Sequence, residues 1–187
     1  MGEITTHRPV LLIAAVTSRY DQALQWTAEN TAAQWGTLVY ESPVFDFTET
    51  SFYTESMGTE LKKQFLAFET LIDPGSIAPT KLKSNDWEKQ YAESNDHPEI
   101  RPLNIDPGYI SEAKLVLVTT KDRDHRLYLE QGIFAEVTLY YRSGEWNSSR
   151  WTYPDYQRED FQAFFTKCRD YLRERIRKLR SDEQTAS

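Results

Sequence analysis

The sequence contains few of the residues from which familiar metal and nucleotide sites are built. Its 187 residues include one cysteine, Cys168, and three histidines, His7, His97 and His125. A single thiol cannot form an internal disulfide, and scattered histidines without a cysteine cluster do not match a structural zinc site. No phosphate-binding loop, dinucleotide-binding glycine motif, nucleophile elbow or HExxH motif is present. The motifs therefore point to no reaction class, and we predict that Cys168 packs in the core.

Long apolar runs are also scarce. The run Val10–Val16 is much shorter than the roughly 20 residues of a membrane-spanning helix. It follows a polar start and is succeeded by Thr17, Ser18 and Arg19, which is not the pattern of a secretory signal. Together with the single cysteine, this predicts a cytoplasmic protein that does not bind membranes.

The net charge of −7 disfavours nucleic acid as a partner, because contacts to phosphate dominate that kind of affinity. The charge is uneven along the chain. Residues 1–60 hold eight acids and two bases, whereas residues 158–180 hold eight bases and four acids. The basic residues gather near the end of a predicted helix, where they also complement the helix dipole. The identity of any protein partner stays unknown at this level.

Length and composition favour a single domain, at the usual size of about 100–200 residues per domain. Aromatic residues make up 13% of the chain, which compensates for a modest number of aliphatic ones in filling a core. We predict one α+β domain over residues 1–180. The polar residues 181–187 are predicted to form a disordered tail.

Apolar spacing and turn residues predict the elements of the first half. A bounded apolar run is typical of a buried strand, and a proline inside a strand favours the edge of a sheet. Apolar residues at spacings of four, three and four indicate a helix. The predicted elements are a strand over Val10–Thr17, a helix over about 19–35 capped by Ser18 and ended by Gly36, a strand over 37–47 broken at Pro43, and a helix over Met57–Ile72.

The second half predicts a different pattern, with three strands separated by short turns. Such strands form an antiparallel meander, here over about 114–142. The predicted elements are a short helix over Asp86–Tyr91, a turn at Asp106-Pro107-Gly108, strands over 114–120, 125–129 and 133–142, and a helix over about 158–179. We therefore predict an α+β fold with a mixed, mostly antiparallel sheet covered by at least three helices.

The richest set of polar residues lies on the predicted meander. Because side chains alternate along a strand, Arg126 and Glu136 are expected on a polar face, with Leu127 and Leu129 turned to the core. A glutamate beside an arginine can orient it for an anionic ligand. His125 is the neighbouring side chain that titrates nearest neutral pH, so we predict it as the proton carrier.

The segment Arg101–Tyr109 is the second candidate. Asp106 can join Glu136 as a base or as a ligand of Mg²⁺, which is a possible cofactor. The predicted catalytic residues are thus His125, Glu136 and Asp106. The predicted ligand-binding residues are Arg126, Lys114, Lys121, Arg101 and Asn104. A weaker cationic spot, Lys81-Leu82-Lys83, could also meet a phosphate.

Each of these features also has an explanation that needs no site. A charged hairpin is commonly a solvated turn, and cross-strand Glu–Arg pairs stabilise exposed sheet faces. An Asp-Pro-Gly sequence is explained by turn geometry alone. Spacing therefore leaves open whether the polar residues of 101–142 form a site or a solvated face of the sheet.

Four stretches resemble a bacterial family known as domain of unknown function 4416. They are FDFTETSFYTESMG (45–58), LNIDPGYISEAKLVLVTTKDRDHRLYL (103–129), GIFAEVTLYY (132–141) and WTYPDY (151–156). The likeness runs from about residue 8 to 175. The resemblance implies no activity and so supplies no catalytic residues. Phe134 stands where the family pattern has a tyrosine, which argues against a catalytic phenol there.

Two hypotheses of function follow. In the first, a pocket over the sheet binds a small anionic or phosphorylated ligand and acts on it, or only binds it. In the second, the protein is a non-catalytic interaction or adaptor module that uses the polar sheet face or the basic C-terminal helix. Convergence of Asp106, His125, Arg126 and Glu136 in one concave pocket would favour the first hypothesis.

Overall fold

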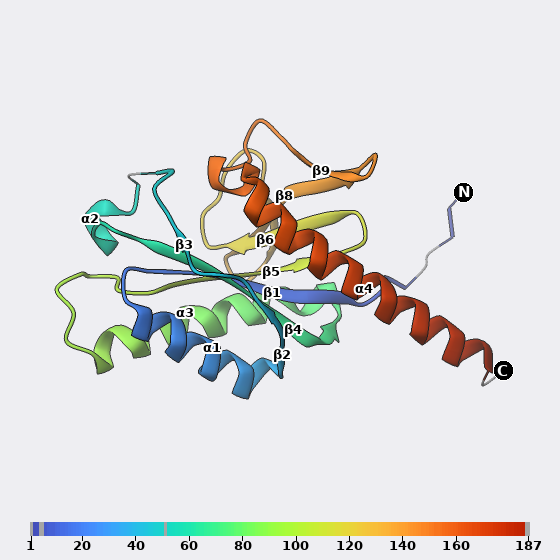
Figure 1. Ribbon diagram of the computed structural model, residues 1–187, viewed down its shortest axis with the longest axis horizontal. Helices are drawn as coiled ribbons and strands as arrows, with labels where there is room; N and C mark the ends of the chain where they lie inside the picture. The colour runs from blue at the N-terminus through green and yellow to red at the C-terminus, as the bar shows by residue number, and fades with distance from the viewer. Residues whose placement is uncertain (1, 4–5, 51, 186–187) are drawn as a thin grey trace.

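A twisted antiparallel sheet forms the centre of the computed structural model, which describes residues 2–3, 6–50 and 52–185 (Figure 1). Within these residues the spatial order of the main path is β2-β4-β1-β5-β6-β8-β7, with β3 beside β4 and β9 beside β8. The strands are β1 (Val10–Ser18), β2 (Leu38–Glu41), β3 (Phe45–Asp46), β4 (Lys62–Ile72), β5 (Asn104–Ile110), β6 (Lys114–Thr119), β7 (Leu127–Glu130), β8 (Ile133–Arg142) and β9 (Glu145–Ser148). The α+β fold with a mostly antiparallel sheet is confirmed.

Helices cover both faces of this sheet. The first and third helices lie on one face, and the long C-terminal helix crosses the other (Figure 1). The helices are α1 (Asp21–Trp35), α2 (Thr54–Met57), α3 (Ile77–Ser94) and α4 (Glu159–Thr185), with short 3₁₀ turns η1 (Pro74–Ser76) and η2 (Pro154–Gln157). No helix among the described residues has the length and apolar character to cross a membrane.

β1 is the central strand, and its alternating side chains feed two cores. Leu11 and Ile13 pack on the α4 side, whereas Leu12 and Ala14 pack on the side of α1 and α3. All nine residues of β1 are buried or nearly so. The predicted strand is confirmed, and its continuous apolar run is explained by helices on both faces.

The core beneath α4 is largely aromatic. The rings of Phe161 and Phe165 lie 4.8 and 4.9 Å from the ring of Phe65 on β4. Cys168 is fully buried in the same cluster, and burial raises the pKa of its thiol, so it packs as predicted. The helix continues to Thr185, so residues 181–185 are helical where we predicted a disordered tail; residues 186–187 lie outside the described part.

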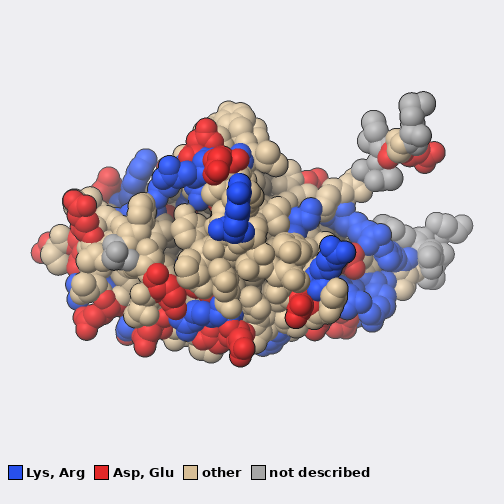
Figure 2. Space-filling view, turned by 90° about the horizontal axis from the view of Figure 1, so that it is seen from above, with Lys and Arg blue, Asp and Glu red and all other residues tan. Residues whose placement is uncertain are grey.

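The C-terminal half of α4 carries exposed basic side chains and extends past the sheet (Figures 1 and 2). Figure 2 shows lysine and arginine gathered toward this end of the molecule. The exposed residues are Arg173, Arg177, Lys178 and Arg180, and Arg175 between them is half-buried. Lys178 pairs with Glu174 one helical turn away, at 3.0 Å. The basic segment of the sequence thus forms one protruding, solvated part of a helix.

The helix predicted over Met57–Ile72 is wrong, because most of that segment is β4. This strand lies between β1 and the edge strands, so both of its faces are covered and Phe65, Leu66, Ala67 and Phe68 are all buried. A register shift opposite Leu11–Ile13 also breaks the two-residue alternation. Apolar residues at spacings of four and three therefore occur here in a strand that is buried on both faces. Such a strand cannot be distinguished from a helix by apolar periodicity alone.

The helix predicted over Asp86–Tyr91 is longer than expected and begins at Ile77. Ser18 does not cap α1 through a helical N–H, since the helix begins at Asp21. Its hydroxyl donates to the carbonyl of Pro102 at 2.7 Å and accepts from the Tyr20 N–H. The edge strand predicted over 37–47 is present as two pieces, β2 and β3, on either side of Pro43.

The three strands of the predicted meander form, but β8 and not β7 lies in the middle. β8 also contains a bulge opposite Leu115–Val116, which switches its faces. As a result, Glu136 is 7% exposed and Val137 is 46% exposed, the reverse of the predicted pattern. On β7, Leu127 and Leu129 are exposed rather than turned to the core.

Candidate functional site

The site begins where the sheet opens between β5 and β6. These strands pair only over Gly108–Ile110 and Leu115–Leu117, although β5 begins at Asn104. The predicted turn at Asp106-Pro107-Gly108 is therefore wrong, because all three residues lie within β5. At Gly108 the strands approach so closely that a Cβ would lie 2.2 Å from the carbonyl oxygen of Val116.

Beyond Gly108, α3 replaces β6 as the partner of β5. The Ile105 N–H donates to Glu88 at 2.8 Å, and the Ile105 carbonyl accepts from Lys81 at 2.7 Å and from Ser84 at 3.2 Å. In an antiparallel strand, the N–H and the C=O of one residue point to the same neighbouring strand, and every second residue points its N–H and C=O in that same direction. Pro107, two residues after Ile105, therefore faces β6. Because proline has no N–H, it cannot donate a hydrogen bond to β6, and the β5–β6 pairing ends there.

A cavity of about 690 Å³ occupies this opening. Its lining comes from α3, from β5 and β6, from Lys63 of β4 and Glu136 of β8, from the loop that follows β6, and from two further parts of the chain, residues 47–50 with 52–53 and residues 153–156. The four stretches quoted above for the family resemblance all contribute residues to this lining. The whole lining of the cavity contains seven cationic side chains and five carboxylates.

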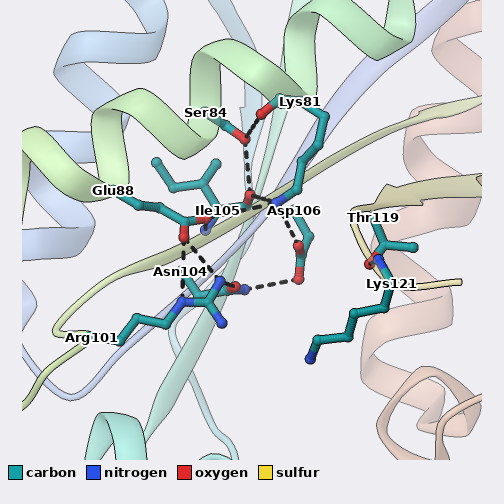
Figure 3. A network of polar contacts seen from close by, with 9 residues as sticks. All are labelled: Lys81, Ser84, Glu88, Arg101, Asn104, Ile105, Asp106, Thr119 and Lys121. Atoms are coloured by element: carbon teal, nitrogen blue, oxygen red, sulfur yellow. Dashed lines mark hydrogen bonds and ion pairs between the residues drawn. The ribbon is translucent and has the colours of Figure 1, made fainter. Parts of the chain in front are cut away.

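One wall of the cavity is a closed polar network around Asp106 (Figure 3). Lys81 reaches from α3 to Asp106 at 2.9 Å and lies 3.7 Å from Glu88. Asn104 donates through its amide nitrogen to the other oxygen of Asp106 at 2.8 Å. Lys81 is 3% exposed, so its charge is stabilised by these partners and not by water.

Arg101 completes the network. It donates to Glu88 at 2.9 Å and also to the carbonyl oxygen of the Asn104 side chain. Because an arginine only donates, this contact fixes the Asn104 amide nitrogen toward Asp106. Lys81, Asp106, Asn104, Arg101 and Glu88 therefore form a ring in which each charge faces an opposite one.

The electrostatics of this ring keep Asp106 ionised. Burial by itself would raise the pKa of the carboxyl, but the charge of Lys81 and the hydrogen bonds from Asn104 and Lys81 hold it at about 2, below its usual 3.8. A carboxylate with so low a pKa is a weak proton acceptor at neutral pH. The geometry thus favours Asp106 as a fixed anion over the role of base.

The opposite wall is formed by the loop after β6, and its lysine has no such partner. The ammonium of Lys121 lies 4.4 Å from the centre of the Phe52 ring. No carboxylate oxygen of the described residues lies within ion-pair distance of it. Lys121 is exposed. Partial desolvation lowers its pKa and the charge of Arg101 lowers it further, whereas the charge of Asp106 acts in the opposite direction. Figure 3 shows the Lys121 side chain extending toward the polar network of Asp106 and Arg101 from the opposite side.

Arg126 and Glu136 line the same cavity and bind each other. The Arg126 Nε donates to Glu136 at 2.7 Å, and the side chains are 4% and 6% exposed. Arg126 also donates to the carbonyl of Lys121 at 2.9 Å, which holds the loop in place. His125 lies behind this pair, 3.0 Å from the same Glu136 oxygen, with its ring stacked on Trp151.

The floor of the cavity is a second buried ion pair, between Lys63 of β4 and Asp155 of η2. Their side chains are 8% and 4% exposed and in direct contact. The Lys63 ammonium also lies 3.9 Å from the centre of the Phe47 ring and 5.1 Å from that of Tyr156. Burial raises the pKa of Tyr156 far above its usual range, so the phenol stays neutral.

Of the eight predicted residues, the structure brings six into the lining of one cavity. These are Arg101, Asn104, Asp106, Lys121, Arg126 and Glu136. His125 contacts Glu136 from outside the lining, and Lys114 lies further along β6, opposite Tyr140 on β8. Among the described residues, no group of three or more His, Cys, Asp or Glu side chains is placed to hold a metal ion.

Sequence reasoning missed Lys63, Asp155 and Glu88, and gave Lys81 too little weight. A signal for the α3 residues was available, because Lys81, Ser84 and Glu88 are three and four residues apart and share one helix face. That signal requires the segment to be recognised as a helix. No comparable signal links Lys63 to Asp155, which are 92 residues apart in the chain.

Comparison with known proteins adds the family but no activity. No curated protein and no solved structure matches the chain. The model of one protein family matches residues 8–171, which is most of the chain and includes every residue of the cavity lining. The chain therefore belongs to the family described as Domain of unknown function (DUF4416).

Proposed function

We propose that the cavity between β5 and β6 binds a small anionic ligand, such as a phosphorylated or carboxylated molecule. The observation that carries this proposal is that Lys121, unlike Lys81 on the other wall, lines the cavity without a carboxylate partner in the described part of the chain. The volume of about 690 Å³ suits a small molecule, for which pockets of about 300–1,000 Å³ are typical.

The charges of the lining support an anion over a cation. Each carboxylate in the lining already has a cationic partner, whether lysine or arginine: Glu49, Glu88, Asp106, Glu136 and Asp155. Three lining cations, Lys89, Lys121 and Arg123, have no carboxylate within ion-pair distance among the described residues. An added anion would therefore complete the charge pairing, whereas an added cation would have to displace a resident lysine or arginine.

The binding proposal is tested by titrating the full chain with inorganic phosphate at fixed ionic strength, using calorimetry and thermal unfolding. We expect phosphate to bind and to raise the melting temperature of the wild type, and Lys121→Ala to lose most of both effects. Lys83→Ala is the matched control, because Lys83 is an exposed lysine outside the lining. Absence of phosphate binding, or equal binding by Lys121→Ala, would contradict the proposal.

We also propose that the protein works in the cytoplasm and that nucleic acid is not its ligand. The unpaired, buried Cys168 fits a reducing compartment. The charge of −7 speaks against a nucleic-acid backbone as the ligand, because contacts to phosphate dominate that kind of affinity.

The β7 edge supports a second candidate function, that of a protein-interaction module. All four residues of β7 are exposed, and Leu127 and Tyr128 are 74% and 62% exposed at the end of the strand order. Exposed apolar edge strands are sites where another strand can pair. Light scattering over a range of concentrations tests self-pairing: association that Leu127→Lys abolishes would support this function, and a monomer at all concentrations would oppose self-pairing.

A further inference from the structure

Large apolar side chains at the mouth of the cavity indicate the chemistry of the part of the ligand that is not the anionic group. Phe52 is 65% exposed, Tyr153 is 50% exposed and Ile100 is 87% exposed, yet all three belong to the lining. None of the three is part of the described core clusters, unlike Phe47 and Tyr156 at the floor. Their exposure is not needed for packing, and exposed apolar groups around a concave site are typical of ligand contact.

The exposed rings lie next to the cations that would hold the anion. The Lys121 ammonium is over the Phe52 ring, at 4.4 Å from its centre. The Tyr153 hydroxyl accepts from Arg126 at 3.4 Å. A ligand of modest size can therefore contact a ring and a cation of this lining at the same time.

From this arrangement we propose that the ligand carries a planar aromatic or heteroaromatic ring beside its anionic group, with the ring against Phe52 and the anion at Lys121. This inference rests on the proposed function and narrows its ligand class. Phe52 lies at right angles to Tyr53, with ring centres 5.2 Å apart, and its exposed ring offers aromatic surface to a ligand. Flat aromatic faces favour stacked or edge-on rings over aliphatic groups of equal size.

The size of the cavity agrees with a ligand larger than an isolated anion. A single phosphate group would fill a small part of about 690 Å³ and would leave the Phe52 and Tyr153 faces in water. A ring in the remaining space would remove these apolar surfaces from water and add the hydrophobic contribution to binding.

The test compares three probes on the full chain by calorimetry at fixed ionic strength: phenyl phosphate, cyclohexyl phosphate and inorganic phosphate. We expect phenyl phosphate to bind about two- to tenfold more tightly than cyclohexyl phosphate, which has a ring of similar size without a π face. Phe52→Leu should remove this preference and leave the affinity for inorganic phosphate unchanged. Tyr128→Leu, which changes an exposed aromatic residue of β7 outside the lining, should leave the preference intact.

The possible failures separate the two proposals. If phosphate binding depends on Lys121 but phenyl and cyclohexyl phosphate bind with equal affinity, the proposed anion site is supported and the inference that the ligand carries an aromatic ring is wrong. A preference for phenyl phosphate that survives Phe52→Leu overturns the placement of the ring against Phe52. If none of the three probes binds, the proposed function and the inference built on it both fall.

Discussion

The two walls of the cavity carry similar charged residues in opposite states. On the α3 wall, Lys81 is buried with three oxygen partners, and Arg101 is held by Glu88 and Asn104. On the wall formed by the loop after β6, Lys121 is exposed, lies against the Phe52 ring and has no carboxylate within ion-pair distance among the described residues. The first wall satisfies its charges internally, whereas the second has positive charge that the described residues do not neutralise.

This difference separates a structural role from a binding role. A buried charge that has all its partners stabilises the fold by fixing the elements around it, here α3 against β5. An exposed lysine without a carboxylate partner is solvated by water, so it contributes little to the fold and can pair with an anion from outside the chain. The comparison therefore predicts large effects on folding from the α3 wall and small effects from the loop wall.

The largest effect is expected for Lys81→Met. This change leaves Asp106 and the Ile105 carbonyl without their partner, and breaking a buried ion pair typically costs about 3–5 kcal/mol of unfolding free energy. Urea denaturation measures the loss. Lys83→Met on the same helix is the control and should change the free energy by about 0.5 kcal/mol or less, as is usual for surface residues. A loss as small as the control's would mean that the ring of charges does not stabilise the fold.

A smaller, pH-dependent effect is expected for Asp106→Asn. The pKa of Asp106 is about 2 in the fold and 3.8 ordinarily, so its ionised form stabilises the fold by about 2 kcal/mol at neutral pH. Because the folded pKa is the lower one, this stabilisation is complete above about pH 4–5 and is lost as the pH falls toward about 2. Unfolding free energies of both proteins between pH 7 and pH 3 measure it.

The gap between wild type and Asp106→Asn should narrow steadily below about pH 4. Asp122→Asn, in the exposed loop after β6, provides the comparison carboxylate. A gap for Asp106→Asn that is constant with pH would show that the loss comes from hydrogen-bond geometry and not from the charge.

The smallest effect on folding is expected for Lys121→Ala. Lys121 is exposed, and its removal relieves repulsion from Arg101 while it loses attraction to Asp106, so the unfolding free energy should stay within about 0.5 kcal/mol of the wild type. The same variant loses phosphate binding under the proposed function, so stability and binding should separate. A destabilisation as large as that of Lys81→Met would place Lys121 among the structural charges and remove the contrast between the walls.

Sequence patterns were sufficient where local chemistry decides the structure. The apolar run of β1, the stop at Gly36, the interruption at Pro43 and the presence of a C-terminal helix all follow from side-chain periodicity and backbone preferences. The polar composition of residues 101–142 also marked six of the residues that line the cavity.

Long-range pairing overrode local signals elsewhere. Asp106-Pro107-Gly108 has the composition of a turn, but β1 pairs along its whole length and extends it. Met57–Ile72 has helical spacing, but most of it is held as a strand between β1 and the edge strands. The bulge in β8 turned Glu136 inward, and alternation alone could not foresee it.

The sequence by itself determined an α+β domain, a buried Cys168 and a polar segment worth testing. Only the tertiary structure decided that the sheet opens between β5 and β6, that Lys81 passes from α3 to Asp106, and that Lys121 stays without a carboxylate among the described residues. The reason is physical. The cost of burying a charge depends on the partners that distant segments bring to it, and no local pattern records which segments meet.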